Sequence, residues 1–277
     1  MIPTVLHWEI GELIDTRLRV LSWNLWWRFG PWEERAPAIA ATLRRIDPDV
    51  VGLQEVWDVD GGPGQAAALA EELGFHHAYA PGFDAGDARF GNAILSRWPI
   101  TASERRELPT TPETNEFRVA LKAEIDGPRG RFQLTTTHLN WRFDESHVRQ
   151  LQVRALAEFV AEDRVAGYPP IVCGDFNADP QSDEIRMMTG RTAIPVPRLV
   201  FVDAWEVAGE GSGVTWCNDN PYAAQDLEPD RRIDYVFAGW PKDHGAGHVV
   251  AARVEGIDPV DGVHPSDHYA VLAELRY

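Results

Sequence analysis

Residues that can bind a metal ion or move a proton recur at the ends of apolar, strand-like segments of this chain. Carboxylates can hold a hard divalent cation or accept a proton, and histidine titrates near neutral pH. One such residue alone is typical of a turn, but several directed from one sheet edge would form a site on rigid supports. The residues in question are Asn24, Glu55, His138, Asn140, Asp175, Asn177, Asp234, Asp267 and His268.

The elements that must position these residues are mostly strands. Apolar or alternating runs predict strands at 18–25, 49–56, 92–96, 118–125, 132–139, 170–173, 233–237, 248–254 and 269–275. Helical periodicity predicts helices at 33–45, 65–73 and 146–162, the last with Ser146 as its N-cap. Strand, helix and further strands follow one another in 18–125 and again in 132–275. This order predicts an α/β or α+β protein in which two sheets pack face to face with helices outside.

Composition limits the class of protein. The chain has 277 residues, 44% of them hydrophobic, which is enough for a large core. We expect one domain spanning 1–277, with 1–17 as a short N-terminal extension and the Gly/Pro-rich stretches 61–64, 81–86 and 195–197 as loops. A net charge of −17 excludes a uniformly basic nucleic-acid-binding surface. The two cysteines, Cys173 and Cys217, are too few for a disulfide framework or a cysteine zinc site, although one disulfide remains open.

The N-terminus lacks the features of a secretory signal. Glu9, Glu12 and Asp15 interrupt residues 1–19, and no basic segment precedes an apolar one. No stretch approaches the roughly 18 apolar residues of a transmembrane helix. We therefore expect no signal peptide, no transmembrane segment and a cytoplasmic location.

Seven short motifs, in this order, resemble those of the endonuclease/exonuclease/phosphatase superfamily, the metal-dependent phosphoesterases related to pancreatic deoxyribonuclease. They span residues 22–268, nearly the whole chain. The resemblance implies a four-layered α/β/β/α sandwich with two packed mixed sheets. The motifs are SWN at 22–24, LQEV at 53–56, GNAILS at 91–96, THL at 137–139, GDFN at 174–177, RIDY at 232–235 and SDH at 266–268.

The same resemblance implies a metal centre. Glu55 would be the main ligand of Mg²⁺, or of Mn²⁺ as the alternative cation, with Asn24 and Asp267 near it. Mg²⁺ keeps several waters, so one or two carboxylates suffice to bind it. The ion would polarise a phosphoryl oxygen and neutralise developing charge.

It also implies the residues that move protons. Asp175 would orient or deprotonate the attacking water, and Asn177 would donate to a phosphate oxygen. Asp234 would fix the tautomer of His268 and raise its basicity. His138 would hold the phosphate or assist the leaving group. Within this family either Asp175 or the Asp234–His268 pair could be the base, and the sequence does not choose between them.

Arg118 and Asn140 are the expected phosphate-binding residues. For Arg118, a surface ion pair with Glu116 or Glu124 is an equally strong interpretation. The helix expected after His138 carries two side chains that would brace the loop of Asn140, namely Arg149 and Gln152.

The loops favour a phosphoester substrate of modest size. The segments 57–64 and 209–231 are acidic, and no run of Lys or Arg is available to neutralise a duplex, so no stable duplex DNA partner is expected. A small soluble phosphodiester or phosphomonoester is the first prediction, and a lipid headgroup is also compatible with the aromatic loops. A nuclease acting on DNA or RNA is the alternative within the enzymes. A catalytically inactive binding scaffold or a cation-binding protein without turnover are the alternatives outside them.

Overall fold

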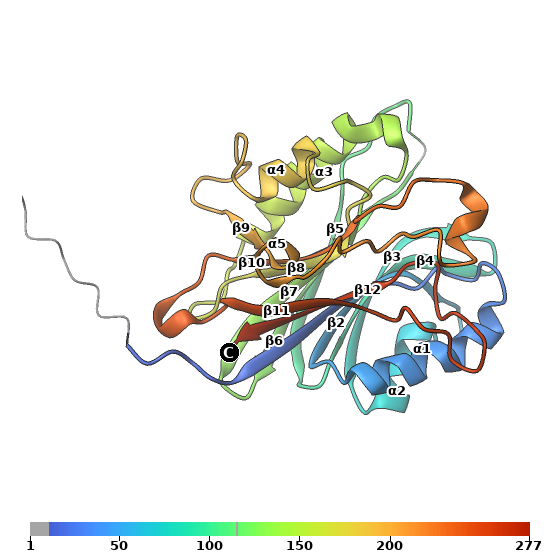
Figure 1. Ribbon diagram of the computed structural model, residues 1–277, viewed down its shortest axis with the longest axis horizontal. Coiled ribbons are helices and arrows are strands. Elements are labelled where there is room, and N and C mark those ends of the chain that lie inside the picture. Colours follow the sequence, from blue (N-terminus) through green and yellow to red (C-terminus); the bar gives the residue numbers. More distant parts are fainter. Residues whose placement is uncertain (1–10, 115) are drawn as a thin grey trace, which may run out of the picture.

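Two six-stranded mixed sheets pack face to face, and helices cover their outer faces (Figure 1). The structure is a computed structural model that describes residues 11–114 and 116–277. In Figure 1, α3 and α4 lie above the strands and α1 and α2 lie below them. The expected four-layered α/β/β/α sandwich is therefore confirmed.

The first sheet has the order β11-β12-β1-β2-β4-β3. Only β1 and β2 are parallel, and the other neighbours are antiparallel. Side chains of the two covering helices pack with β1 and β2 in one apolar cluster. The strands are β1 (Arg17–Asn24), β2 (Val50–Asp58), β3 (His76–Ala85), β4 (Ala88–Ser96), β11 (Val249–Glu255) and β12 (Ala270–Arg276), and the helices are α1 (Trp32–Ile46) and α2 (Gln65–Leu73).

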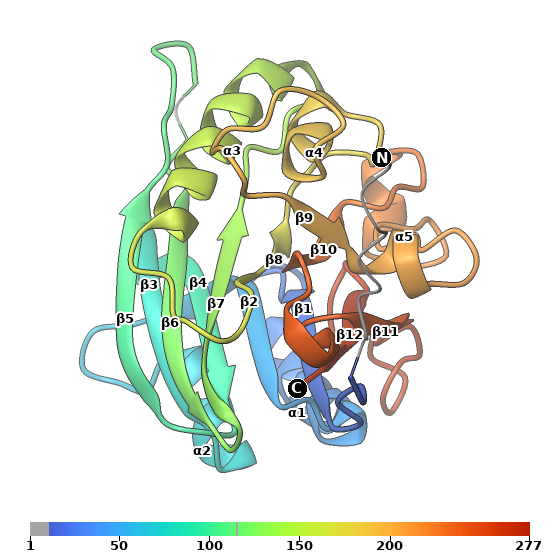
Figure 2. The same ribbon diagram turned by 90° about the vertical axis from the view of Figure 1, so that its left-hand side faces the viewer.

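The second sheet has the order β5-β6-β7-β8-β10-β9, and β7 and β8 are its parallel pair. Figure 2, turned by 90°, shows α3 along the outer side of this sheet. The strands are β5 (Ile100–Glu107), β6 (Val119–Gly127), β7 (Gly130–His138), β8 (Ile171–Asp175), β9 (Phe201–Asp203) and β10 (Asp234–Gly239). The helices are α3 (Ser146–Ala161), α4 (Asp183–Met188), α5 (Ala204–Ala208) and the short η1 (Phe143–Glu145), η2 (Ala223–Asp226) and η3 (Asp243–Gly245).

The two sheets approach each other closely at Gly52. A Cβ atom at this position would lie 2.2 Å from Cys173 Sγ and 3.0 Å from the Thr136 side chain, both on the facing sheet. Only glycine therefore permits this spacing. Cys173 is buried in this interface, and both it and Cys217 are free thiols, so the single disulfide that the sequence left open is absent.

Some elements differ from the expected ones. β3, β5 and β9 were not predicted, and the stretch 81–86 belongs mostly to β3 rather than to a loop. β5 is an edge strand whose side chains are mostly exposed, so it carries no apolar alternation. Ser146 is the first residue of α3 rather than its N-cap, and its hydroxyl donates to Glu184 instead.

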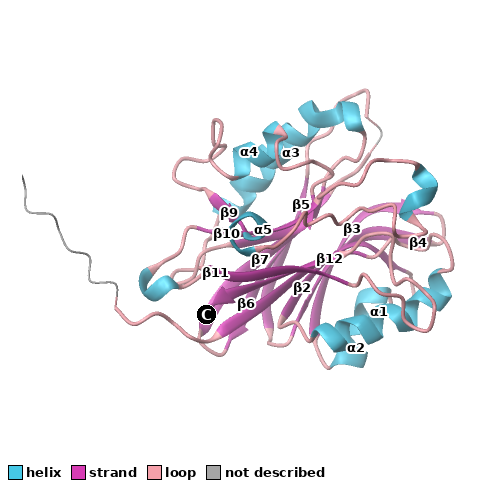
Figure 3. Ribbon diagram, viewed as in Figure 1, coloured by secondary structure: helices cyan, strands magenta, loops and turns pink. Residues whose placement is uncertain are grey.

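The N-terminal extension was expected at 1–17. Residues 1–10 lie outside the described part of the chain, and β1 already begins at Arg17. None of the described helices has the length and apolar character needed to cross a membrane. Figure 3 shows that strands make up the centre of the molecule and helices its periphery.

Candidate active site

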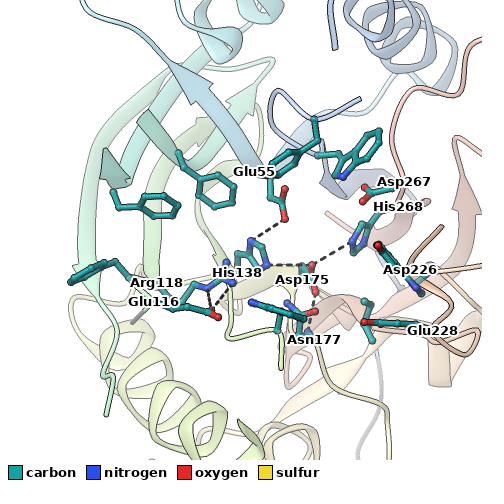
Figure 4. Close-up of a pocket in the computed structure, with 18 of the residues that line it drawn as sticks. Glu55, Glu116, Arg118, His138, Asp175, Asn177, Asp226, Glu228, Asp267 and His268 are labelled. Atoms are coloured by element: carbon teal, nitrogen blue, oxygen red, sulfur yellow. Dashed lines mark hydrogen bonds and ion pairs between the residues drawn. The ribbon is translucent and has the colours of Figure 1, made fainter. Parts of the chain in front are cut away.

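One edge of the sandwich gathers the ends of its two parallel strand pairs. β1 ends there at Asn24, which is paired to Gln54 of the neighbouring β2. β7 and β8 end there with His138 paired to Asp175, and β10 begins there with Asp234 opposite Asp175. A pocket of about 840 Å³ opens at this edge (Figure 4). The topology thus brings residues from both sheets into one site.

Glu55 reaches the pocket because β2 is irregular at this point. The pairing of β2 with β4 shifts between Leu53 and Val56, and Glu55 has a left-handed backbone with φ of 54°. A bulge of this kind turns a side chain away from the regular alternation. Its Oε1 accepts a hydrogen bond from Asn24, while Oε2 is buried and has no hydrogen-bond partner among the described residues.

Asn24 joins two carboxylates. Its Nδ2 donates to Glu55 Oε1 at 3.2 Å and to Asp175 Oδ2 at 3.0 Å. Its Oδ1 accepts from the backbone N–H of Trp26 at 2.9 Å, which fixes the amide orientation. Asn24 therefore orients Glu55 and Asp175 relative to each other.

His268 lies between two carboxylates. Its Nδ1 is 2.9 Å from Asp234 Oδ2, and its Nε2 is 3.7 Å from Asp175 Oδ2. The Trp216 ring packs edge-on against it, with 4.9 Å between centroids. Burial alone would lower the pKa of His268, but Asp234, Asp175 and Asp267 together raise it well above its ordinary value. The surrounding carboxylates therefore favour the charged form of His268.

Asp175 is the carboxylate that the other groups surround. Burial, and next the charge of Asp234, raise its pKa to about 7, against the opposing effect of His268. His138 Nε2 lies 3.5 Å from Asp175 Oδ2 on the side away from His268. Burial, followed by the charges of Arg118 and His268, lowers the pKa of His138 well below its ordinary value. Asp175 thus lies between His138, whose neutral form is favoured, and His268, whose charged form is favoured.

Asp267 completes the acidic part of the pocket. The Ser266 hydroxyl lies 2.7 Å from the carbonyl oxygen of Asn24 and 3.2 Å from Asp267 Oδ1, so it links β1 to this residue. Burial first, and then the charge of Glu55, raise the pKa of Asp267 to about 7, while His268 opposes this. Asp267 and Glu55 are therefore close enough to influence each other's charge.

Arg118 and Asn177 also line the pocket. Arg118 donates to Glu116 from Nε at 3.2 Å and from Nη2 at 2.8 Å, so the ion pair with Glu116 is present. Asn177 has a left-handed φ of 49°, its N–H donates to Asp175 Oδ1, and its Nδ2 donates to the Leu139 carbonyl.

Asn140, by contrast, is not among the residues that line the pocket. It is fully buried, and its side chain donates to Glu145 and accepts from Gln152. Arg149 donates to its backbone carbonyl. Gln152 and Arg149 thus brace this loop, as expected, and the structure does not bring the Asn140 amide to the site.

A buried arginine, which sequence reasoning missed, holds the site together from α1. Arg35 donates to five backbone carbonyls at 2.8–3.0 Å, four of them in the loop after β1 and the fifth that of Pro265, just before Asp267. Within that loop Trp26 and Trp27 both have positive φ. Arg35, Ile39 and Leu43 are four residues apart and lie on one face of α1. This spacing could have predicted that Arg35 is buried. The loop acceptors are Leu25, Trp26, Trp27 and Phe29.

Two groups of residues could hold a cation. Among the described residues, Asp175, Asp234 and His268 offer ligand atoms within 4.8 Å of one another. However, His268 Nδ1 already pairs with Asp234 Oδ2 at 2.9 Å, so two of these three groups are engaged with each other. The buried, unpartnered Oε2 of Glu55 is instead a hard oxygen donor of the kind that Mg²⁺ prefers. The donor set around Glu55 and Asp267 fits such an ion better.

The remaining pocket lining combines acids with aromatic rings. Trp216, which contacts His268, carried no signal in the sequence because its segment shows no periodicity. Carboxylates outnumber the single lining arginine. The acids are Glu55, Asp84, Glu116, Asp175, Asp226, Glu228 and Asp267, and the aromatic residues are Trp26, Phe29, Phe83, Phe90, Phe117, Trp141 and Trp216.

Comparison with known proteins identifies related chains. The sequence profile of the Endonuclease/Exonuclease/phosphatase family matches residues 21–268. The chain is 25% identical over 93% of its length to the Schizosaccharomyces pombe inositol phosphosphingolipids phospholipase C, and over 92% to the Gallus gallus tyrosyl-DNA phosphodiesterase 2. It spans 68% and 66% of the lengths of these relatives. A crystal structure of an endonuclease/exonuclease/phosphatase from Beutenbergia cavernae superposes with a TM-score of 0.70 at 26% identity, over 94% of this chain and 71% of that one.

Proposed function

Because the chain belongs to the endonuclease/exonuclease/phosphatase family, we propose that it hydrolyses phosphodiester bonds with the help of a divalent cation. One observation carries this proposal. A buried carboxylate, Asp175, lies between a neutral and a charged histidine, and Asn24 ties it to Glu55, which has an unpartnered oxygen. This arrangement supplies a proton acceptor, a proton donor and a cation ligand within one pocket.

Glu55 and Asp267 would hold the cation, with Asn24 orienting Glu55. Mg²⁺ is the first candidate and Mn²⁺ the second, because both accept oxygen ligands. When bound, the ion would polarise a phosphoryl oxygen and offset the negative charge that develops on it. It would also compensate the mutual repulsion of Glu55 and Asp267.

Asp175 is the better candidate for the base. Its pKa of about 7 lets it take a proton from water near neutral pH, whereas His268 already carries one. His268, held by Asp234, would donate a hydrogen bond to a phosphoryl oxygen. The neutral His138 would face the other side of Asp175. The water proton would pass to the Asp175 carboxylate as the water oxygen bonds to phosphorus and the P–O bond to the leaving group breaks. The alkoxide released would take its proton from a solvent water.

The charge of the lining favours a phosphodiester over a phosphomonoester. A diester carries one negative charge and a monoester nearly two at neutral pH. Against seven carboxylates, the lining has one arginine, which Glu116 already pairs, and His268, which Asp234 pairs. The same imbalance disfavours duplex DNA, whose binding depends on neutralised phosphates. Single-stranded nucleic acid is the second candidate, since bases can stack on aromatic side chains, and the relative from Gallus gallus is a tyrosyl-DNA phosphodiesterase.

A hydrolysis panel tests the proposal. Bis-p-nitrophenyl phosphate, p-nitrophenyl phosphate, sphingomyelin, phosphoinositides, RNA and single- and double-stranded DNA would be offered with Mg²⁺, Mn²⁺ or EDTA. His268→Ala should lower kcat by about 10²–10⁴-fold. The matched control is His248→Ala, since His248 is exposed and does not line the pocket. Full activity in His268→Ala would refute the site, and no hydrolysis by the unchanged protein would favour a binding scaffold.

A further inference from the structure

Large apolar side chains are exposed around the mouth of the pocket. Four of them line it directly, a fifth lies between the lining residues Asp226 and Glu228, and the sixth lies two positions after Trp141. Their exposed fractions run from 39% to 88%. We call these six the apolar rim: Phe29, Phe83, Phe117, Trp141, Phe143 and Leu227.

The rim is assembled from distant parts of the chain. Its members come from the β1–α1 loop, from β3, from the β5–β6 connection, from the segment between β7 and α3, and from the segment before β10. Both sheets therefore contribute. The described chain has eleven exposed large apolar residues, and six of them belong to this rim. Single exposed apolar residues are ordinary, but a concentration of them around a pocket marks an interaction site.

The charged side chains around the apolar rim indicate which kind of surface it contacts. The acids Asp84, Glu116, Asp226 and Glu228 line the pocket beside it. Arginines beside the rim carry carboxylate partners. These pairs are Arg28 with Asp87, Arg118 with Glu116, Arg142 with Glu116 and Glu145, and Arg231 with Asp179 and Glu228. An anionic membrane or a nucleic acid would need cations that are not already paired.

We propose that the apolar rim docks the protein on a zwitterionic lipid surface. Aromatic and leucine side chains are favourable at a lipid–water interface. The ammonium groups of zwitterionic lipids face outward and complement the acids of the pocket. This inference rests on the proposed function in one respect: the docked pocket would face the phosphodiester of a lipid whose chains remain in the surface.

Vesicle binding tests the docking surface without any hydrolysis. The protein would be sedimented with vesicles of pure phosphatidylcholine, and with vesicles containing added anionic phosphatidylserine, in EDTA. We expect binding to phosphatidylcholine and weaker binding as the anionic lipid increases. Phe117→Asp and Leu227→Asp should each reduce partitioning roughly tenfold, since each removes one exposed apolar side chain from the interface and adds a charge. Both positions are exposed, so the variants should fold, which thermal unfolding would verify.

Trp240→Asp is the matched control, because Trp240 is 72% exposed and does not line the pocket. It should bind vesicles as the unchanged protein does. His268→Ala should also bind them, so failure of the proposed chemistry and failure of docking remain distinguishable. Absent binding, stronger binding to anionic vesicles, or an equal loss in Trp240→Asp would each overturn the proposal. Rim-dependent binding of a single-stranded oligonucleotide in place of vesicles would overturn it as well.

Discussion

Replacing Arg35 by Met should destabilise the protein and weaken cation binding together. The guanidinium donates to five backbone carbonyls, all at 2.8–3.0 Å, and is 1% exposed. The four N–H groups of Nη1 and Nη2 serve these five acceptors, so at a net value of about 1 kcal/mol for each N–H the variant would lose about 4 kcal/mol. Removing a buried charge returns part of this loss, because its desolvation cost disappears. We therefore expect the free energy of unfolding to fall by about 3 kcal/mol.

The cation affinity should fall because Arg35 ties the loop after Asn24 to Pro265, two residues before Asp267. Without this link, the two segments that carry candidate ligands can separate. Arg35→Lys keeps the charge but has at most three donors, so at least two carbonyls lose their partner. The stability and the Mg²⁺ affinity of Arg35→Lys should both lie between those of the unchanged protein and of Arg35→Met.

Urea unfolding and Mg²⁺ titration calorimetry would measure the two effects. A loss of about 3 kcal/mol corresponds to a decrease in Tm of about 5 °C for a chain of this size. Lys122→Met is the control, because Lys122 is also buried and donates to two backbone carbonyls, those of Phe159 and Glu162, away from the site. It should lose stability without losing Mg²⁺ affinity. The reasoning would be refuted if Arg35→Met kept its stability, or if both variants changed Mg²⁺ affinity equally.

The remaining predictions concern the carboxylates. Glu55→Gln should weaken Mg²⁺ binding more than any other single amide substitution in the pocket, which calorimetry would measure; an unchanged affinity would mean that the ion binds elsewhere. In the metal-free protein, Asp175 and Asp267 have pKa values of about 7, so the native state holds protons that the unfolded chain releases above its own pKa near 3.8. The free energy of unfolding in EDTA should therefore fall as the pH rises from about 5 to 8, by up to about 1.4 kcal/mol per pH unit for each extra proton. His138 opposes this trend only below its ordinary pKa of 6.5. Urea unfolding at several pH values would measure the trend, and a free energy of unfolding that stayed constant or rose with pH would contradict the prediction.

The helices and strands that were predicted correctly are mostly those with a clear local pattern of apolar residues. α2 was predicted at its observed bounds, and β2 within two residues at each end, because an apolar run between turn residues is a local property. β5 was not, because its place at a sheet edge leaves its side chains in solvent. The position of Ser146 within α3 also depended on a distant partner, Glu184, which lies in α4.

A position at a strand end predicted which residues lie near the site. It did not predict what each side chain contacts there. Asp175 and His268 follow and precede apolar runs, and this placement put them at one edge. Asn140 has the same kind of position, yet its amide turns to Glu145 and Gln152. A strand end fixes where a backbone lies, whereas hydrogen bonds to other elements decide where a side chain points.

The two-sheet architecture, the family motifs and the shortage of positive charge could be inferred without coordinates, because they depend on residue type and order along the chain. Three features came from the packed structure instead: Glu55 turns into the pocket at a bulge, the pKa values of His268 and His138 shift in opposite directions, and Arg35 joins α1 to both ligand-bearing segments. Each of these depends on burial and on partners more than 30 residues away or on another strand. Burial and long-range contacts are properties of the packed chain, so no local pattern contains them.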